Sequence, residues 1–155
     1  NSYKSIFNVF ASHADIFIAG HYFKSGSPNF FTKNDAKSKD FKIKTIADIS
    51  CDINGPIPST IRSSTIENPI YGYNPKTEKE DVFDKKDVIS VMAVDNLPCE
   101  LPKDSSEDFG DELIKHVLPL LIEKDDFNII KRATICENGK LTSHFNYLES
   151  FINRG

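Results

Sequence analysis

Apolar residues gather in short runs that predict three β-strands in this 155-residue chain. The first run spans residues 15–20 and ends at a glycine, which is typical of a buried strand that stops at a turn. The second spans residues 42–50, and the third, residues 88–94, is nearly unbroken and rich in β-branched side chains. Runs of this kind indicate strands of a parallel sheet that is covered on both faces.

Helices are predicted mainly in the last third of the chain. Ser105 or Ser106 is a favourable N-cap, because acidic residues follow in what would be the first turn. The apolar residues beyond this cap lie on one helical stripe: Phe109, Leu113, Val117, Leu120 and Leu121. Pro119 is expected to bend this helix or to start another. A further amphipathic helix is expected over residues 143–154.

The segments between the predicted strands are long. Residues 51–75 contain four prolines and few regular patterns, but their Ile and Tyr content predicts an ordered, packed loop. Residues 76–87 are rich in charge and predict a solvated hairpin or turn. Residues 25–28 predict another turn, and Thr32 with Asp35 predicts the start of a helix. Strands that are joined by long crossings and followed by helices favour the α/β class.

Composition narrows the range of functions. A net charge of -4, with 27% charged and 39% hydrophobic residues, is typical of a soluble domain and argues against broad binding to nucleic acid or anionic lipid. No apolar run approaches the roughly 20 residues that a membrane span needs. The three scattered cysteines suit a reducing compartment, and neither they nor the four histidines have zinc-ligand spacing. We expect a cytoplasmic protein, or a mitochondrial-matrix protein in a eukaryote.

Two of the predicted strands end in acidic or amide residues that precede a turn. Asp52 follows the second strand, and Asp95 and Asn96 follow the third. Ligands bind at the carboxyl ends of strands in open α/β sheets, so these carboxylates could position a cationic amine. Three apolar side chains beside them could cover a flat ring: Ile49, Val94 and Leu97. The alternative is that Asp52 and Asp95 only cap turns, as such residues commonly do after strands.

Five short runs of the sequence resemble one enzyme family in order and spacing. They are DISCDING at 48–55, STIENP at 64–69, VDNLPCELP at 94–102, FGDEL at 109–113 and NGKL at 138–141. They resemble the D-I-S-A-D-x-G-G, T-T-I-x-x-P, I-D-N-L-P-x-Q-L-P, F-G-D-x-L and N-G-x-L runs of lysine-ketoglutarate reductase, the domain that makes saccharopine. The wider group of similar layout includes alanine dehydrogenase, the first domain of nicotinamide nucleotide transhydrogenase and yeast-type saccharopine dehydrogenase.

The resemblance implies a domain layout. In this group a Rossmann domain is inserted into a substrate domain, and the chain returns through a long helix. Residues 1–104 would be the carboxy-terminal part of the NAD(P)-binding domain, with the last strands of a partial Rossmann-like parallel sheet. Residues 105–155 would be the return helix and terminal segment of the substrate domain. Because the sequence has no GxGxxG turn to hold a pyrophosphate, we expect a segment of a longer enzyme that is inactive alone.

The resemblance also implies roles for single residues. Asp52 matches a catalytic carboxylate that faces the reacting carbon, and Ile49 matches a residue beside the nicotinamide. Four residues match the loop that touches the nicotinamide ribose and ring: Val94, Asp95, Asn96 and Leu97. Asn54 replaces the first glycine of the family's Gly pair, and Asn tolerates a left-handed backbone. The four histidines match no catalytic residue and are expected at the surface or in packing.

The implied function is hydride transfer between NAD or NADP and a C–N bond of saccharopine, in lysine degradation or biosynthesis. Pro56 and Pro58 depart from the reductase pattern toward the yeast-type enzymes, so the exact amino-acid and oxo-acid substrates and the reaction direction stay open. The alternatives are an alanine dehydrogenase-like enzyme and a non-catalytic binding or assembly subunit. No nucleic-acid, membrane or metal partner is expected, and a homodimer is compatible with the sequence.

Overall fold

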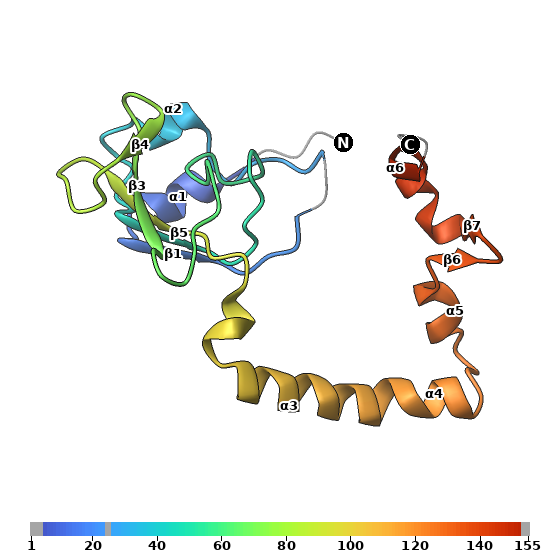
Figure 1. Cartoon of the computed structure of the whole chain (residues 1–155). Coiled ribbons are helices and arrows are strands. Elements are labelled where there is room, and N and C mark those ends of the chain that lie inside the picture. Colours follow the sequence, from blue (N-terminus) through green and yellow to red (C-terminus); the bar gives the residue numbers. More distant parts are fainter. Residues whose placement is uncertain (1–4, 24–25, 153–155) are drawn as a thin grey trace. The chain divides into compact units, whose positions relative to one another are not determined.

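The computed structural model describes residues 5–23 and 26–152, and the chain divides into two compact units, residues 1–100 and 101–155 (Figure 1). The first unit contains α1 (Phe7–Ala11), β1 (Ile16–Ala19), α2 (Lys33–Ala36), β2 (Thr45–Asp48), β3 (Ile70–Asn74), β4 (Lys79–Asp81), β5 (Ile89–Met92) and the 3-10 helix η1 (Leu97–Glu100). The division lies four residues before the boundary expected from the sequence.

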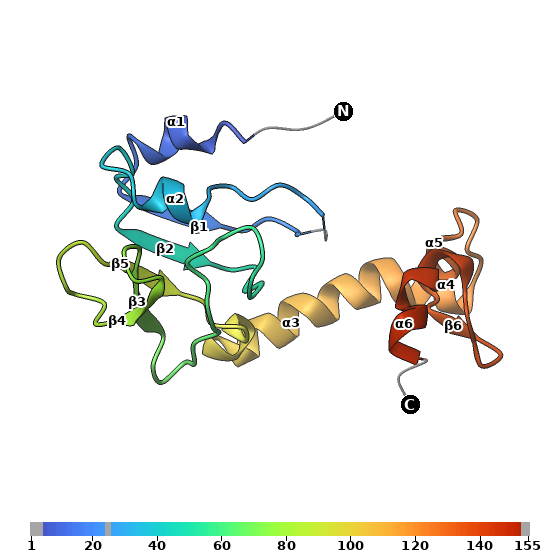
Figure 2. The ribbon, with the colours of Figure 1, turned by 90° about the horizontal axis from the view of Figure 1, so that it is seen from above.

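A five-stranded sheet in the order β1-β2-β5-β3-β4 organises the first unit (Figure 2). β1, β2 and β5 are the three strands predicted from the apolar runs, and they pair in parallel. β3 pairs antiparallel with β5, and β4 pairs antiparallel with β3. The prediction of an α/β fold with a mainly parallel sheet is therefore confirmed.

The prediction that residues 51–75 form only a loop is wrong at the end of that segment, where β3 forms. Tyr71 and Tyr73 of this strand are 3% and 0% exposed. β3 has little local signal because it is short and lies between Pro69 and Pro75, so its pairing with β5 decides its conformation. Part of the remaining segment is packed, as expected, with Ile57, Ser59 and Thr60 buried. The charged segment 76–87, predicted as a solvated hairpin or turn, contributes β4 and most of the turn to a hairpin whose first strand, β3, begins earlier at Ile70.

The core lies on one face of the sheet. Phe17, Ile46 and Val91 occupy one row across β1, β2 and β5 on the face that α1 and α2 cover, and Ile46 and Val91 are fully buried. The expectation that both faces are covered is wrong for β1. Successive side chains of a strand point to opposite faces, so Ile16 and Ile18 lie on the face away from this core, where they are 63% and 68% exposed.

Helix α2 begins with the signal that the sequence predicts. The Thr32 side-chain oxygen accepts a hydrogen bond from the Asp35 backbone N–H at 3.1 Å. The Asp35 carboxylate accepts one from the Thr32 backbone N–H at 2.7 Å, which completes a capping box. These bonds satisfy two donors that a short helix would otherwise leave open. Of the turn predicted over residues 25–28, residue 25 lies outside the described residues.

The second unit begins with three consecutive helical segments: α3 (Pro102–Glu112), the π-helical turn η2 (Leu113–Val117) and α4 (Leu118–Ile122). The predicted N-cap at Ser105 or Ser106 is wrong, because Pro102 already occupies the first turn with a preset φ and no N–H to satisfy. Pro119 lies in the first turn of α4, as expected for a proline that starts a new helical segment. The expected stripe is not buried, since none of the described residues of this unit is.

The end of the chain differs from the single amphipathic helix predicted over 143–154. After α5 (Ile129–Ala133) and the two-stranded β6 (Cys136–Glu137) and β7 (Lys140–Leu141), the chain forms a 3-10 helix, η3 (Ser143–Leu148), and then α6 (Glu149–Ile152). A non-helical backbone at Phe145 interrupts the helix, and residue 154 lies outside the described residues. Across the described residues, no helix has both the length and the apolar character that crossing a bilayer requires.

Candidate functional site

The carboxyl ends of β2 and β5 lie at the same edge of the sheet. The two strands are parallel neighbours, with Thr45, Ile46 and Ala47 opposite Ser90, Val91 and Met92. The turn after β2 and the loop after β5 therefore leave the sheet side by side. This arrangement brings together the two segments that contain every site residue proposed from the sequence.

The site residues differ in how far they are accessible. Ile49 is 44% exposed, and Asp95 and Asn96 are also exposed. Asp52 and Leu97 are partly buried. Val94 is 3% exposed, so its side chain packs inside and a ligand could meet it mainly through the backbone.

Asp48 is the residue at this edge that the sequence did not single out. Its carboxylate is buried, with 1% exposure, and accepts four hydrogen bonds. Ser50 donates its hydroxyl at 2.6 Å and its N–H at 3.1 Å, and the Cys51 N–H donates at 3.2 Å. Thr60 donates its hydroxyl to the other oxygen at 2.6 Å. Asp48 therefore fixes the turn after β2 and ties it to the long loop.

Glycine at position 55 is required by the close approach of Asp52. The Gly55 N–H donates to the Asp52 carbonyl at 2.9 Å, and Asn54 adopts the left-handed φ of 58° that its residue type tolerates. A Cβ on Gly55 would lie 2.6 Å from the Asp52 Cβ and 2.7 Å from its carbonyl oxygen. The turn would have to move, and Asp52 with it.

We predict that Gly55→Ala lowers the free energy of unfolding by about 1–3 kcal/mol, because the clash is with backbone and Cβ atoms that cannot rotate away. The control is Gly20→Ala, where nothing lies within 4 Å of an added Cβ, and a change below about 0.5 kcal/mol is expected. Urea denaturation followed by circular dichroism measures both. Equal midpoints for the two variants would contradict the prediction.

The pKa of the Cys51 thiol reflects both burial and the negative charges at this edge of the sheet. Burial raises the pKa of this thiol to about 11, and three negative charges act in the same direction. These charges belong to Asp48, Asp95 and Asp52, so the turn after β2 and the loop after β5 share one electronegative region. Such a field favours a positively charged group in a ligand.

We predict that Cys51 reacts slowly with thiol reagents. At pH 8, roughly one thiol in a thousand would be ionised at a pKa of about 11, and the thiolate is the reactive form. Ellman's reagent should detect two fast thiols, the exposed Cys99 and Cys136, and one at least tenfold slower. Cys51→Ala should remove only the slow phase, and loss of a fast phase instead would show that the assignment is wrong.

The loop that follows the turn is fastened to the end of β5 by Ser64. Its N–H donates to the Ala93 carbonyl at 2.8 Å, and the Ala93 N–H donates to its hydroxyl oxygen at 3.0 Å. The same hydroxyl donates to the Pro69 carbonyl at 2.8 Å. Ser64 therefore extends the sheet by one bridge, to Val94, beside the proposed site.

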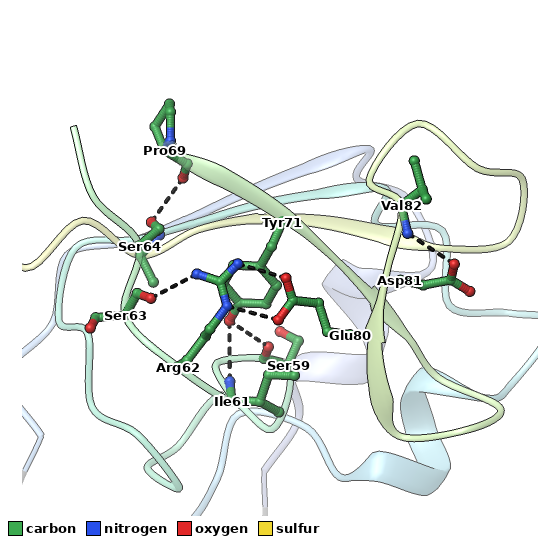
Figure 3. Close-up of polar contacts among 11 residues, drawn as sticks. Ser59, Ile61, Arg62, Ser63, Ser64, Pro69, Tyr71, Glu80, Asp81 and Val82 are labelled. Atoms are coloured by element: carbon green, nitrogen blue, oxygen red, sulfur yellow. Dashed lines mark hydrogen bonds and ion pairs between the residues drawn. The ribbon is translucent and has the colours of Figure 1, made fainter. Parts of the chain in front are cut away.

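Arg62 fastens the same loop to the β3–β4 hairpin (Figure 3). Its guanidinium forms a bidentate pair with Glu80, at 2.8 and 2.7 Å, and lies 4.4 Å from the ring centre of Tyr71. The hydrogen bond from Arg62 holds the pKa of Glu80 below its usual value. The Tyr71 hydroxyl in turn donates to the Ser59 carbonyl and accepts from the Ile61 N–H. These contacts give Arg62 a structural role, because its guanidinium is already bound to Glu80 and packed on Tyr71.

The histidines take no part in these networks. The ring of His21 packs against Phe30 with centroids 4.7 Å apart, and the other three histidines are exposed. Within the described residues, no group of three or more His, Cys, Asp or Glu side chains is placed to hold a metal ion.

Comparison with known proteins identifies the relatives of the chain. No family model matches it. It is 28% identical to mouse mitochondrial alpha-aminoadipic semialdehyde synthase over 175 positions, which cover 95% of this chain. It is 36% identical to the Arabidopsis thaliana alpha-aminoadipic semialdehyde synthase over 117 positions, which cover 74% of this chain. It is 30% identical over 112 positions to the Schizosaccharomyces pombe saccharopine dehydrogenase [NAD(+), L-lysine-forming], covering 70% of this chain. The chain is homologous to a segment of these enzymes.

The homology concerns only part of each relative. The chain spans 19% of the length of the mouse synthase, 11% of the Arabidopsis synthase and 28% of the fission-yeast saccharopine dehydrogenase. A solved structure of L-alanine dehydrogenase aligns with a TM-score of 0.55 and 14% identity, over 95% of this chain and 38% of that one. The saccharopine dehydrogenase-type segment thus shares its fold with alanine dehydrogenase, and the family resemblance inferred from the five sequence runs is confirmed.

Proposed function

We propose that this chain provides the nicotinamide-facing edge of an NAD(P)-dependent saccharopine dehydrogenase-type oxidoreductase of lysine metabolism. The observation that supports the proposal is the parallel pairing of β2 with β5 in a chain homologous to saccharopine dehydrogenases. Because of this pairing, the turn that contains Asp52 and the loop that contains Asp95 and Asn96 leave the same edge of the sheet. Residues 1–104 would belong to the cofactor-binding domain, and residues 105–155 to the return helix and the substrate domain.

The residues of this edge fit the ring end of a nicotinamide cofactor. Ile49 offers an exposed apolar side chain for a flat ring, and Asp95 and Asn96 offer hydrogen-bonding groups for a ribose and a carboxamide. Val94 would contribute its backbone and Leu97 its half-buried side chain. The bound cofactor, NAD or NADP, would supply or accept the hydride.

Asp52 would be the catalytic carboxylate. It is partly buried in a turn that the Asp48 hydrogen bonds and Gly55 hold in place, so its position would change little when a ligand binds. Its negative charge, together with those of the surrounding acidic residues, would steady the positively charged nitrogen of an amino-acid substrate while the carbon next to it reacts. The protein would act in the cytoplasm, or in the mitochondrial matrix of a eukaryote.

The test is an assay of the native protein from its source for reduction of NAD and NADP, followed by absorbance at 340 nm. Saccharopine should support reduction, and L-alanine should not. Reduction with alanine alone would replace the proposal by an alanine dehydrogenase-like activity. No reaction in either direction, with lysine and 2-oxoglutarate tried for the reverse, would favour a non-catalytic subunit. The 155-residue chain by itself should be inactive.

A further inference from the structure

A cavity of about 820 Å³ lies at the opposite end of the sheet from the proposed site. Its walls are the residues that lead into β2 and β5, from 36 to 39, from 41 to 45 and from 83 to 90, with Pro75 and Lys76 from the hairpin. Both segments lie at the same end of the sheet in Figures 1 and 2. The volume lies within the range of about 300–1,000 Å³ that is usual for sites of small organic ligands.

The lining of this cavity is basic although the chain as a whole is acidic. Seven lysines line it, against two carboxylates, Asp84 and Asp87. Four of the lysines have acidic partners: Lys37 with Glu78 at 2.6 Å, Lys44 with Asp15 at 2.7 Å, Lys85 with Asp81 at 3.1 Å and Lys76 with Asp87 at 3.4 Å. In the part of the chain that the structure describes, no carboxylate forms an ion pair with Lys39, Lys42 or Lys86. A bound anion would supply the negative charge that these three lysines lack.

The type of cation and its neighbours indicate the chemistry of the anion. Every cation in the lining is a lysine and none is an arginine, so the cavity offers point charges, of the kind with which lysines bind phosphate groups. The Lys42 ammonium donates to the Lys39 backbone carbonyl at 2.9 Å, which holds the Lys42 side chain against the loop that contains Lys39. Phe83, 48% exposed, and the half-buried Phe41 add apolar surface to the same cavity. An aromatic ring face of this kind can stack on a nucleobase.

We propose that this cavity binds a nucleoside polyphosphate, with its phosphates on Lys39, Lys42 and Lys86 and its base against Phe83. This site is separate from the one proposed for the nicotinamide. The amino ends of β2 and β5 line the cavity, whereas the proposed nicotinamide site lies at the carboxyl ends of the same two strands. The two sites could be occupied together. The inference does not depend on the enzyme activity proposed above.

The test is isothermal titration calorimetry of the 155-residue chain with magnesium-free ATP and with inorganic triphosphate, at an ionic strength of about 20 mM, where screening is weak. ATP should bind at one site and at least tenfold more tightly than triphosphate. Combined Lys39→Gln, Lys42→Gln and Lys86→Gln substitutions should weaken both ligands at least tenfold. Phe83→Ala should weaken only ATP.

The matched control removes three lysines of the second unit, Lys103, Lys131 and Lys140, by substitution with glutamine, and affinity should stay within threefold. An equal loss in this control would mean that only net charge matters, which overturns the proposal. Absence of ATP binding up to 5 mM would do the same. Equal affinity for ATP and triphosphate, unchanged by Phe83→Ala, would overturn the assignment of a nucleoside. Amide chemical shifts of the unmodified chain provide a second measurement, because ATP should perturb residues 37–45 and 83–90 and spare residues 49–52.

Discussion

Replacing Asp48 by alanine is expected to lower the free energy of unfolding by about 3 kcal/mol or more. The substitution removes the acceptor of four hydrogen bonds at a site that is 1% exposed. The hydroxyls of Ser50 and Thr60 and two backbone N–H groups would then be left without that partner. A buried polar group without a partner costs about 1–3 kcal/mol, and water can replace only part of the loss. Guanidinium denaturation of the 155-residue chain measures the change.

Two further variants separate the role of Asp48 from a general effect of charge. Asp48→Asn keeps one carbonyl oxygen as acceptor but replaces the other oxygen by an NH₂ group, which faces groups that now donate to Asp48. An intermediate loss of the free energy of unfolding is therefore expected. Asp52→Ala removes a neighbouring carboxylate that accepts no hydrogen bond within the described residues, and a change within about 0.5 kcal/mol is expected. If Asp48→Ala and Asp52→Ala unfold at the same denaturant concentration, the Asp48 network does not hold this turn.

The parts of the fold that the sequence predicted are those with a local cause. Apolar runs marked β1, β2 and β5, and the Thr32 and Asp35 pair marked α2, since each signal lies within the element itself. β3 was missed because its partner is β5, about twenty residues later, and prolines flank it. The exposed side chains Ile16 and Ile18 were missed for a related reason: an edge strand and a central strand can have the same composition.

The sequence predicted that the two segments of the candidate site leave the same edge of the sheet, but it did not predict the hydrogen bonds of Asp48 that hold one of them. Parallel pairing of strands places their carboxyl ends together, so Asp52 and Asp95 could be expected in one region from strand order alone. Asp48 begins the family-like run at 48–55, but its structural role was not predicted, because a carboxylate at the end of an apolar run usually faces solvent. Only the partner twelve residues later, Thr60, explains why this one is buried. Of the residues proposed in the turn after β2, Ile49 is exposed and Asp52 is partly buried, whereas Asp48, which holds the turn, is fully buried.

In the native protein, Asp52→Ala is expected to lower turnover at least a hundredfold and to change the dissociation constant for NAD(P)H less than threefold. If Asp52 steadies positive charge on the substrate nitrogen, its removal raises the barrier of the chemical step, and a single positioned carboxylate commonly contributes 10²- to 10⁴-fold. The cofactor would still meet Ile49 and the loop after β5. Steady-state kinetics with saccharopine and fluorescence titration with NAD(P)H measure the two quantities.

Two variants make this prediction specific to the charge of Asp52. Asp52→Asn keeps the size of the side chain and removes only its charge, so it should be nearly as slow as Asp52→Ala. Asp108→Ala removes an exposed carboxylate of α3 and should leave turnover within twofold. Full activity in Asp52→Asn would mean that the charge is not used and that Asp52 serves only the turn. Because the side chain of Asp52 makes no hydrogen bond within the described residues, lost turnover in a stable Asp52→Ala protein would reflect chemistry rather than unfolding.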